Sequence, residues 1–490
     1  MLFLGIDIGT TGTKSILIDE QGSIIKQAYH GYGLTSLRSG WVEQNPFDWW
    51  EAVKLTVKEC LNDEQLKERL CALAISAQGG SMALLDQSGE FLGDAISWLD
   101  TRAKVGRQTF IDEKGEEYYH ERTGFMLNAG LAMQNIRWLK THDPERFGKV
   151  AAVYTTLDYI NLKLTGRAVI DPSCASLMQL LNIGKKCWDK EILNLIGFDQ
   201  TKLALIKPSG SLVGNLTADA AAEIDLPERI KVYNGGLDQS CMALGSGAIN
   251  NGDVVLSTGT AWVMLAITDK PDVIRGLRFS VIPHVIENKW CFFSSIPSAG
   301  ASLDWLREKL LSMDETESYK DMDIKIAECE PGAKGITLYP FFTEAAGHTS
   351  QVIGLTLAHN RYDVLRAYME SICFEIKLLL DALAREGFKH ESLKVTGGAS
   401  RSKIWMSILS NVLNKTVHVE SQPDAACIGA CRLATIGSGY ASEADFGYQP
   451  DTRKATGIIE TESRFEPNKN ETEIYQKLYE EYIQNRAAGN

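Results

Sequence analysis

Two short Gly-Thr loops, each set between apolar strands, constrain the fold of this chain more than any other feature. Residues 2–19 read LFLGIDIGTTGTKSILID, and residues 254–267 read VVLSTGTAWVMLAI. The loops begin at Gly9 and Gly259, 250 positions apart in a chain of 490 residues. A strand–loop–strand unit that recurs at the start of each half predicts a duplicated α/β domain. Two unrelated hairpins are the alternative, because Gly-Thr turns are common.

The first loop has the chemistry of a phosphate site without the spacing of a familiar nucleotide motif. Residues 9–14 (GTTGTK) do not match G-x-x-x-x-G-K-[ST], and no G-x-G-x-x-G segment follows a strand and opens a helix. The loop offers backbone N–H groups unshielded by side chains, three hydroxyls and Lys14. Such a loop can hold phosphate oxygens.

The composition argues against several classes of protein. The chain has 50 Lys+Arg against 63 Asp+Glu and a formal net charge of −13, the opposite balance to that of a general nucleic-acid binder. The N-terminal apolar run breaks at Gly9, well short of the ~20 residues that span a bilayer. The ten cysteines form no C-x-x-C array, and a reducing cytoplasm is expected. We therefore expect neither nucleic acid nor membrane as a partner, and a homodimer is a possible arrangement.

Hydrophobic periodicity predicts helices between the apolar strands. In the last of them Ile474, Leu478 and Tyr482 are expected to face the core. A segment led by Asp424, AACIGACRLA, is rich in small residues and predicts a helix that approaches its neighbour closely. Helices are predicted over 47–61, 64–70, 134–140, 157–164, 363–386 (capped by Asp363 or Asn360) and 472–483, after Ser400 or Ser402, and after Asp424.

Two acidic residues stand at the ends of predicted strands, next to glycines. Asp7 lies beside the first loop, where it could hold Mg²⁺, usually through water; a turn-forming side chain is the alternative. Asp238 follows Gly235-Gly236, where a carboxylate can accept the proton of a bound hydroxyl; a helix-capping side chain is the alternative. With the donor-rich loop, the two carboxylates indicate phosphoryl transfer from ATP.

A group of polar and aromatic residues suits a small hydroxylated ligand. A Trp ring can cover the C–H face of a sugar, while carboxylate, guanidinium and amide groups bind hydroxyls. The alternative places the Trp in the core and makes the acidic and basic residues of the group a surface ion pair. The members are Gln78 and Gly79, Trp98, Asp100 and Arg102, and Gln239.

Taken together, these motifs resemble the FGGY carbohydrate kinases, a family that includes xylulokinases, glycerol kinases, gluconate kinases and ribulokinases. The resemblance covers nearly the whole chain, with the segments in family order. They are LGIDIGTTGTK (4–14), GWVEQNPFDWW (40–50), WLDTRA (98–103), LDYINLKLTG (157–166), DPSCAS (171–176), NGGLDQ (234–239), LSTGTAW (256–262) and TGGASRSKIWMSILSNVLNKTV (396–417).

The resemblance implies a fold and a set of roles. The fold is a two-domain actin-like ATPase of the ribonuclease H-like type, with domains at 1–247 and 248–490. ATP would lie in the cleft between the lobes, and closure would exclude water. Asp238 matches the general base and Asp7 the carboxylate on the Mg²⁺ side. The residues matched to ATP are Gly9, Thr10, Thr11 and Lys14 in the first phosphate loop, Thr258, Gly259 and Thr260 in the second, and Gly397, Gly398, Ala399 and Ser402 in the nucleotide wall.

The departures from the family pattern concern the acceptor. Xylulokinases usually read Q-M-H-G-A where this chain has QGGSM at 78–82, so the substrate-binding His is absent. The Arg-Glu pair of glycerol kinases is absent as well. Gln239 is similar to glycerol kinases, whereas Trp98-Leu99-Asp100 is similar to xylulokinases.

The resemblance implies ATP-dependent phosphorylation of a ketose, sugar acid or polyol, with a xylulose-like pentulose as the leading candidate. Glycerol, gluconate or another polyol is the alternative within the family. An actin- or chaperone-like nucleotide switch is the alternative from another class, but such a switch would have no use for a polar ligand group around Gln78 and Trp98.

Overall fold

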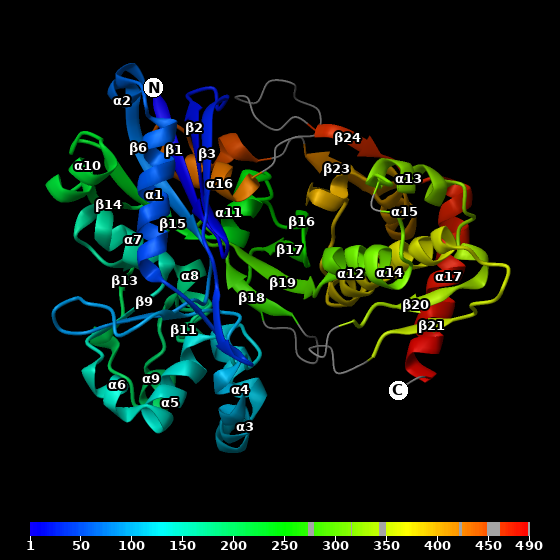
Figure 1. Ribbon diagram of the computed structural model, residues 1–490, viewed down its shortest axis with the longest axis horizontal. Coiled ribbons are helices and arrows are strands. Elements are labelled where there is room, and N and C mark those ends of the chain that lie inside the picture. The colour runs from blue at the N-terminus through cyan, green and yellow to red at the C-terminus, as the bar shows by residue number, and fades with distance from the viewer. Residues whose placement is uncertain (273–278, 315, 343–348, 421–423, 448–460, 489–490) are drawn as a thin grey trace. The chain divides into compact units, whose positions relative to one another are not determined.

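The computed structural model shows two compact units, each built from separate stretches of the chain (Figure 1). Unit 1 comprises Met1–Asn251, Ile267–Phe292 and Asp424–Ile458, and unit 2 comprises Gly252–Ala266, Phe293–Pro423 and Ile459–Asn490. The predicted domain boundary after residue 247 remains a prediction. The residues described are 1–272, 279–314, 316–342, 349–420, 424–447 and 461–488.

Unit 1 is organised by a six-stranded sheet in the order β14-β15-β6-β1-β2-β3. β1 and β2 form an antiparallel hairpin that places Asp7 opposite Lys14, while β1 and β15 run parallel to β6. Most residues of β1, β2 and β6 are buried, as expected for strands covered on both faces. The strands are β1 (Leu2–Ile8), β2 (Gly12–Asp19), β3 (Ile24–Gly31), β6 (Leu70–Ala77), β14 (Leu212–Asn215) and β15 (Lys231–Leu237).

A second sheet repeats this pattern in the other half of the chain. Its seven strands have the order β18-β19-β17-β16-β22-β23-β24. β16 pairs antiparallel with β17 and parallel with β22, β22 is parallel to β23, and β24 is antiparallel to β23. The same directions join β1 to β2 and β6, β6 to β15, and β15 to β14. The duplicated core is confirmed, and the interpretation as two unrelated hairpins is wrong. The strands are β16 (Val254–Thr258), β17 (Trp262–Thr268), β18 (Ser280–Pro283), β19 (Trp290–Ile296), β22 (Ser392–Gly397), β23 (Thr416–Glu420) and β24 (Thr461–Phe465).

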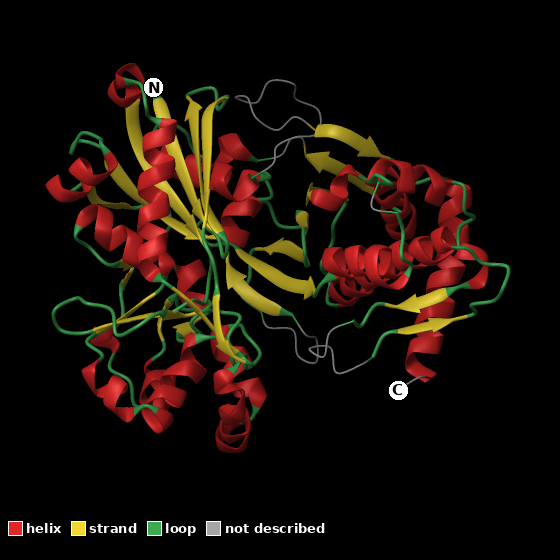
Figure 2. Ribbon diagram, in the orientation of Figure 1, coloured by secondary structure: helices red, strands yellow, loops and turns green. Residues whose placement is uncertain are grey.

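Some helices of unit 1 pack against its six-stranded sheet, and others gather away from it (Figure 2). α1 begins after an Asn45 cap with Pro46 in its first turn, where the fixed φ of proline suits a helix start. It packs against β2 and β3. The helices are α1 (Pro46–Cys60), α2 (Glu64–Arg69), α3 (Arg107–Lys114), α4 (Glu116–Thr123), α5 (Ala132–His142), α6 (Pro144–Lys149), α7 (Thr156–Thr165), α8 (Pro172–Ser176), α9 (Lys190–Ile196), α10 (Ala218–Ile224), α11 (Asp238–Gly245) and α16 (Ala425–Gly437).

α16 lies directly on α11 and β1 because glycines remove the side chains that would separate them. A Cβ on Gly429 would lie 1.9 Å from the carbonyl oxygen of Cys241 in α11, and one on Gly5 would lie 2.3 Å from that of Cys427. Cys427 is buried, and its thiol donates to the carbonyl of Gly5 over 3.2 Å. The predicted close approach of this helix is confirmed, and packing explains Cys427.

Unit 2 has its own helices around the second sheet. Asn360 caps α14 in a capping box with Asp363, and Ser402 caps α15. The prediction for the last helix is partly wrong. Ile474 is 43% exposed, and the buried face consists of Tyr475, Tyr479 and Tyr482. The helices are α12 (Ala299–Trp305), α13 (Tyr319–Ala327), α14 (Arg361–Arg385), α15 (Lys403–Leu413) and α17 (Lys469–Ala488).

Among the residues that the structure describes, no helix has both the length and the apolar character to cross a membrane.

Candidate active site

Three neighbouring strands of unit 1 bring polar residues to one edge of the sheet. Asp7 is in register with Ser76 of β6, Gln78 follows the end of β6, and Asp238 follows the end of β15. Because parallel strands have their carboxyl ends at the same edge, these side chains gather there. Ser76 Oγ donates a hydrogen bond to Asp7 Oδ1 over 2.6 Å.

A bulge at the end of β15 positions Asp238. The pairing of β15 with β6 shifts register between Tyr233 and Gly236, and a Cβ on Gly235 would lie only 1.5 Å from the carbonyl oxygen of Ile75. A bulge of this kind re-aims the chain beside a site. Asp238 is the first residue of α11, whose cap position is Leu237. The helix-capping alternative for Asp238 is therefore wrong.

Burial raises the pKa values of both carboxyl groups. The pKa of Asp238 rises to about 7, first because of burial and then because of the charge of Asp7, while the N–H of Gln239 opposes the shift. The pKa of Asp7 rises to about 6 through burial and the charge of Asp424, opposed by the Ser76 hydrogen bond and by Lys14. A carboxyl group that titrates near pH 7 has the proton affinity of an efficient general base.

Lys14 forms an ion pair with Asp424, at the N-terminal end of α16. Asp424 occupies the cap position of that helix at φ 75°, and its side chain makes no capping hydrogen bond. The predicted position of Asp424 before the helix is confirmed, but its carboxylate binds Lys14 instead of capping. α16 thus holds the ammonium group that the sequence predicts for phosphate.

The first loop is fixed by bonds to its backbone. Gly9 N donates to the carbonyl of Gly12 over 2.9 Å, and Tyr32 Oη donates to the carbonyl of Gly9 over 2.7 Å. Gln44 Nε2 donates to the carbonyl of Thr10 over 2.7 Å. The side chain of Thr11 is exposed. The loop is thus preorganised.

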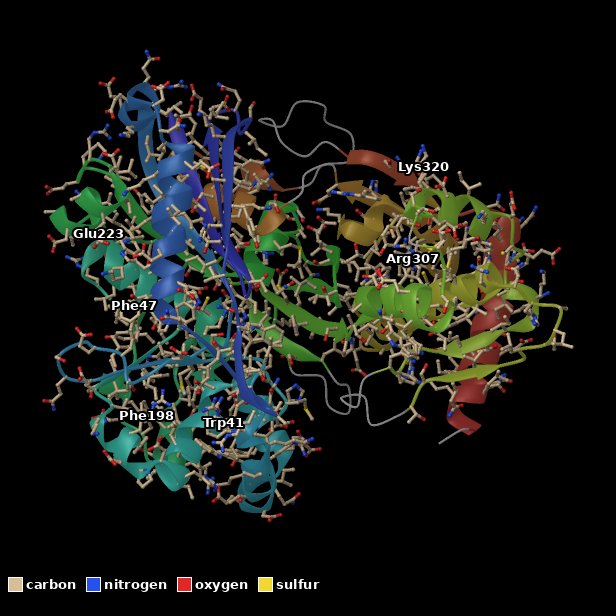
Figure 3. The ribbon with its side chains drawn as sticks, in the orientation of Figure 1. Trp41, Phe47, Phe198, Glu223, Arg307 and Lys320 are labelled. Carbon is tan, nitrogen blue, oxygen red and sulfur yellow. The ribbon has the colours of Figure 1, made fainter. Side chains whose placement is uncertain are left out.

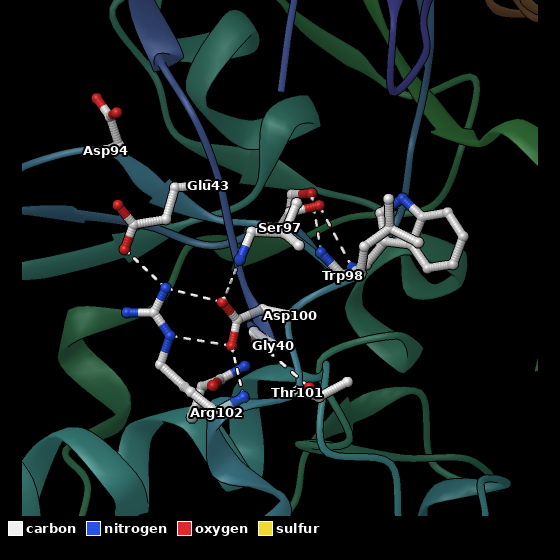
Figure 4. A network of polar contacts seen from close by, with 12 residues as sticks. Gly40, Glu43, Asp94, Ser97, Trp98, Asp100, Thr101 and Arg102 are labelled. Atoms are coloured by element: carbon white, nitrogen blue, oxygen red, sulfur yellow. Dashed lines mark hydrogen bonds and ion pairs between the residues drawn. The ribbon is translucent and has the colours of Figure 1, made fainter. Parts of the chain in front are cut away.

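Trp98 and Asp100 behave differently from either sequence interpretation. Trp98 is 43% exposed, so the core alternative is wrong, and its Nε1 donates to Thr10 Oγ1 over 3.0 Å. Asp100 and Arg102 form a buried ion pair (0% and 6% exposed) that Glu43 joins, so the surface-pair alternative is also wrong. In Figure 4 the Trp98 ring points away from this network.

The network leaves Asp100 little capacity for a ligand. Its Oδ2 accepts from the backbone N–H of Val42 and from Arg102 Nη2, and its Oδ1 accepts from Arg102 N and Nε. The guanidinium carbon of Arg102 lies 3.7 Å from the ring centroid of Trp41. Asp100 therefore fixes the loop that carries Trp98, and its predicted contact with substrate remains a prediction.

Buried amides border the same edge of the sheet. Gln78 is 2% exposed, and its Nε2 donates to Gln44 Oε1 over 2.9 Å. The Oε1 atoms of Gln78 and Gln239 are buried and have no hydrogen-bond partner among the described residues. Unpaired buried acceptors are costly, and a ligand that donates hydroxyl groups would satisfy them.

Leucines fill the space beside Gly79 and Gly80. A Cβ on Gly79 would lie 2.5 Å from Leu237 Cδ1, and one on Gly80 would lie 2.8 Å from Leu131 Cδ2. Gly80 also has φ +83°, which favours glycine. A Met-His pair therefore does not fit these two positions without rearrangement.

Unit 2 contains a pocket of about 1100 Å³ beside the second Gly-Thr loop. Thr258 is buried, and its hydroxyl donates to the carbonyl of Thr396 over 2.7 Å, whereas Gly259 and Thr260 are exposed. Gly397 stands at φ +100°, and a Cβ there would lie 2.7 Å from the carbonyl oxygen of Thr258. Six of the seven residues predicted for this side line the pocket, all but Gly397: Thr258, Gly259, Thr260, Gly398, Ala399 and Ser402.

Other residues that line this pocket are not predicted from the sequence. Gly300 at the start of α12 donates its N–H to the carbonyl of Thr260 over 2.9 Å, and a Cβ there would lie 2.2 Å from the carbonyl oxygen of Gly259. The small residues PSAGAS at 297–302 are the signal that could have found it. Asp304 on α12 and Asp323 on α13 also line the pocket, and nothing in their local sequence marks them.

Comparison with known proteins identifies the class. Residues 2–245 match the N-terminal domain of the FGGY family of carbohydrate kinases, and residues 254–438 match its C-terminal domain. The chain belongs to this family. It has the two-domain, actin-like fold of these enzymes and is an ATP-dependent kinase of a small carbohydrate hydroxyl. The kinase hypothesis is confirmed over the nucleotide switch.

Individual relatives include enzymes for different sugars. A xylulose kinase of Bacillus subtilis is 27% identical over 483 residues, covering 97% of this chain and 96% of the relative. A gluconokinase of Bacillus licheniformis is 26% identical over 499 residues, covering 98% and 94%. The crystal structure of xylulose kinase from Rhodospirillum rubrum superposes with a TM-score of 0.91 at 26% identity, covering 100% of this chain and 98% of that one.

The buried network around Arg102 gives a stability prediction. Arg102→Met leaves Asp100 and Glu43 as buried carboxylates without their cation. The free energy of unfolding should therefore fall by about 3–5 kcal/mol. Urea-induced unfolding followed by tryptophan fluorescence measures this loss. Lys149→Met, which breaks the exposed Lys149–Glu145 pair, is the control and should unfold as the wild type does. An Arg102→Met protein as stable as this control would contradict the structural role given to Arg102.

Proposed function

We propose that Asp238 is the general base of the kinase and that the acceptor sugar binds at the strand-end edge of unit 1. The observation that carries this proposal is the half-buried Asp238 carboxyl group at the end of a bulged strand, with a pKa of about 7. The exposed ring of Trp98 and the unpaired oxygens of Gln78 and Gln239 border this edge. They would cover the C–H face of a sugar and accept its hydroxyl protons.

The reaction follows from these groups. The hydroxyl oxygen of the sugar forms a bond to the γ-phosphorus of ATP while the bond from that phosphorus to ADP breaks. The hydroxyl proton passes to the carboxylate of Asp238. Because this transfer is mainly a matter of positioning and charge, the fixed backbone of the first loop is suited to holding phosphate oxygens, with Lys14 alongside.

The nucleotide side of the proposal rests on the pocket of unit 2. Gly259, Thr260, Gly398 and Ala399 would offer backbone N–H groups to phosphate oxygens. Thr258 acts through the backbone position of its loop, since its hydroxyl is bonded within the sheet. Gly397 allows the close approach of β22 to β16, and Ser402 lies at the N-terminus of α15.

We propose Asp7 as the residue that would hold Mg²⁺. This cation binds proteins through one or two carboxylates and keeps several waters, and Asp7 presents one half-buried carboxylate beside the first loop. Mg²⁺ bound there would neutralise charge on the phosphate oxygens.

A xylulose-like pentulose is the acceptor that we propose first. Support comes from the relatives named xylulose kinase and from Trp98-Leu99-Asp100. Gly79 and Gly80 stand where xylulokinases usually carry Met and the substrate-binding His. Recognition of the sugar would therefore rest on Gln78 and Gln239. We also propose domains at 1–247 and 248–490 and a cytoplasmic location, which the ten free thiols support; a homodimer is the oligomeric state to test first.

Removing the base should stop catalysis without stopping nucleotide binding. Asp238→Asn should lower kcat by roughly 10²–10⁴-fold, because the amide cannot take the hydroxyl proton, and calorimetry should show nearly unchanged ADP affinity. Asp219→Asn, an exposed change on α10, is the matched control and should retain wild-type kcat. Wild-type turnover by the Asp238 variant would contradict the assignment of Asp238 as the general base.

The pH profile tests the same carboxyl group. Only the carboxylate can act as base, so kcat/KM for the sugar should be low in acid and rise with pH through a midpoint near 7. In protein free of Mg²⁺, Asp7→Asn removes the neighbouring charge that raises the pKa of Asp238, so the midpoint of the Asp238 titration followed by NMR should move to lower pH. An unchanged midpoint in the Asp7 variant would contradict the proposed coupling.

A substrate panel tests the acceptor. ADP release with ATP and D-xylulose, D-ribulose, gluconate or glycerol should be fastest with xylulose, and Gln78→Leu should raise KM for the sugar by roughly tenfold, because one hydrogen bond is lost. Faster turnover of gluconate or glycerol would replace the proposed acceptor and leave the kinase class unchanged.

A further inference from the structure

The pocket of unit 2 is lined by two chemically different groups of residues. In the first group, Gly259, Thr260, Gly398 and Ala399 present backbone with little side chain. The wall formed by α13 carries the carboxyl group of Asp323. Lys320, Arg401 and Lys403 line the pocket as well. Because a carboxylate repels phosphate groups, Asp323 itself suits a hydrogen-bond donor of the nucleoside rather than a phosphate.

The surroundings of Asp323 suit a flat, mostly apolar base. Leu303, Met322, Met369 and Trp405 line the same pocket and are buried. Lys320, which also lies on α13 and lines the pocket, is labelled in Figure 3. Ligand sites typically combine apolar walls with a few polar groups that fix orientation, and Asp323 is such a group.

Ser402 leaves one oxygen of Asp323 for a ligand. The Ser402 hydroxyl donates to Asp323 Oδ1 over 2.9 Å and accepts the N–H of Trp405 over 3.2 Å. The hydroxyl is thereby engaged on both sides. Asp323 Oδ2 has no hydrogen bond within the part of the chain that the structure describes. Burial raises the pKa of Asp323 to about 6, so the group is mostly ionised at pH 7.5 and accepts hydrogen bonds there.

We propose that Asp323 is a specificity-determining residue that selects adenine nucleotides by accepting a hydrogen bond from the exocyclic amine of the base. That amine is the only N–H donor of adenine in a nucleotide, and hypoxanthine has a carbonyl oxygen in its place. Asp323 would therefore attract the amine of the first base and repel the carbonyl oxygen of the second, whose remaining donor is the neighbouring N1–H.

The inference rests on the proposed nucleotide pocket and deepens it. Ribose hydroxyls are the other donors of an adenine nucleotide, so the experiment separates the two. Calorimetry without sugar measures the Kd of ADP, inosine diphosphate and 2′-deoxy-ADP for the full-length wild type, Asp323→Ala and Asp323→Asn. Glu328→Gln, an exposed change at the C-terminal end of α13 and outside the pocket, is the matched control.

The wild type should bind ADP roughly ten- to hundredfold more tightly than inosine diphosphate, as expected for a hydrogen bond to a charged group. Asp323→Ala should remove most of this preference. Asp323→Asn, which keeps an acceptor for Ser402, should reduce or invert it because the amide can donate to the carbonyl of hypoxanthine. The Glu328 control should retain the preference, and the ratio between ADP and 2′-deoxy-ADP should not change in either Asp323 variant.

A wild type without the preference, or an Asp323→Ala protein that keeps it within twofold, would overturn the proposal. A change in the 2′-deoxy ratio instead would assign Asp323 to the ribose and overturn it as well. Because sugar plays no part in these titrations, failure here is distinct from failure of the proposed sugar chemistry, which Asp238→Asn and the substrate panel report.

Discussion

The contact of α16 with β1 and α11 is the constraint on which the first active-site loop depends. Glycines at 5, 245 and 429 let backbone meet backbone, since a Cβ on any of them would lie only 1.8–2.3 Å from a neighbouring carbonyl oxygen. At such distances even one methyl group forces a shift of the helix, because packed interiors have no spare volume. The position of α16 sets that of Asp424, and Asp424 sets that of Lys14.

The strand arrangement also determines the positions of the two carboxyl groups. Parallel pairing aligns the ends of β1, β6 and β15, so that backbone hydrogen bonding alone brings Asp7 and Asp238 close enough to interact. Burial and mutual repulsion then raise the pKa of Asp238 into the range useful for a base. The bulge at Gly235 sets the direction in which this base points. Fold and proton affinity are therefore two results of one strand arrangement.

Local sequence patterns predict the helices, the strands and the polar residues at the strand ends. They do not predict contacts between residues that are far apart in the sequence. Both hairpins, the strand ends at Asp7 and Asp238, and the α16 glycines carry their meaning within a few residues. The burial of Asp100 and Arg102 depends on Glu43, which is 59 positions from Arg102. Asp323 meets Ser402 across 79 positions.

The face of a helix is a further limit. The sequence predicts Ile474 in the core because it fits a 3.6-residue stripe, but the stripe shifted by one residue fits equally well. Aromatic packing decides between them: the Phe374 ring lies 6.4, 5.9 and 5.2 Å from those of Tyr475, Tyr479 and Tyr482.

The division of the chain also ties the two units together during biosynthesis. The strands of the first sheet are complete once residue 237 has been made, but the helix that covers β1 is not made until residues 425–437. While the ribosome synthesises most of unit 2, β1 lacks this cover and Lys14 lacks Asp424. A chain that is interrupted anywhere in that interval lacks α16 and cannot complete unit 1. Unit 1 can therefore be completed only after nearly the whole polypeptide has been synthesised.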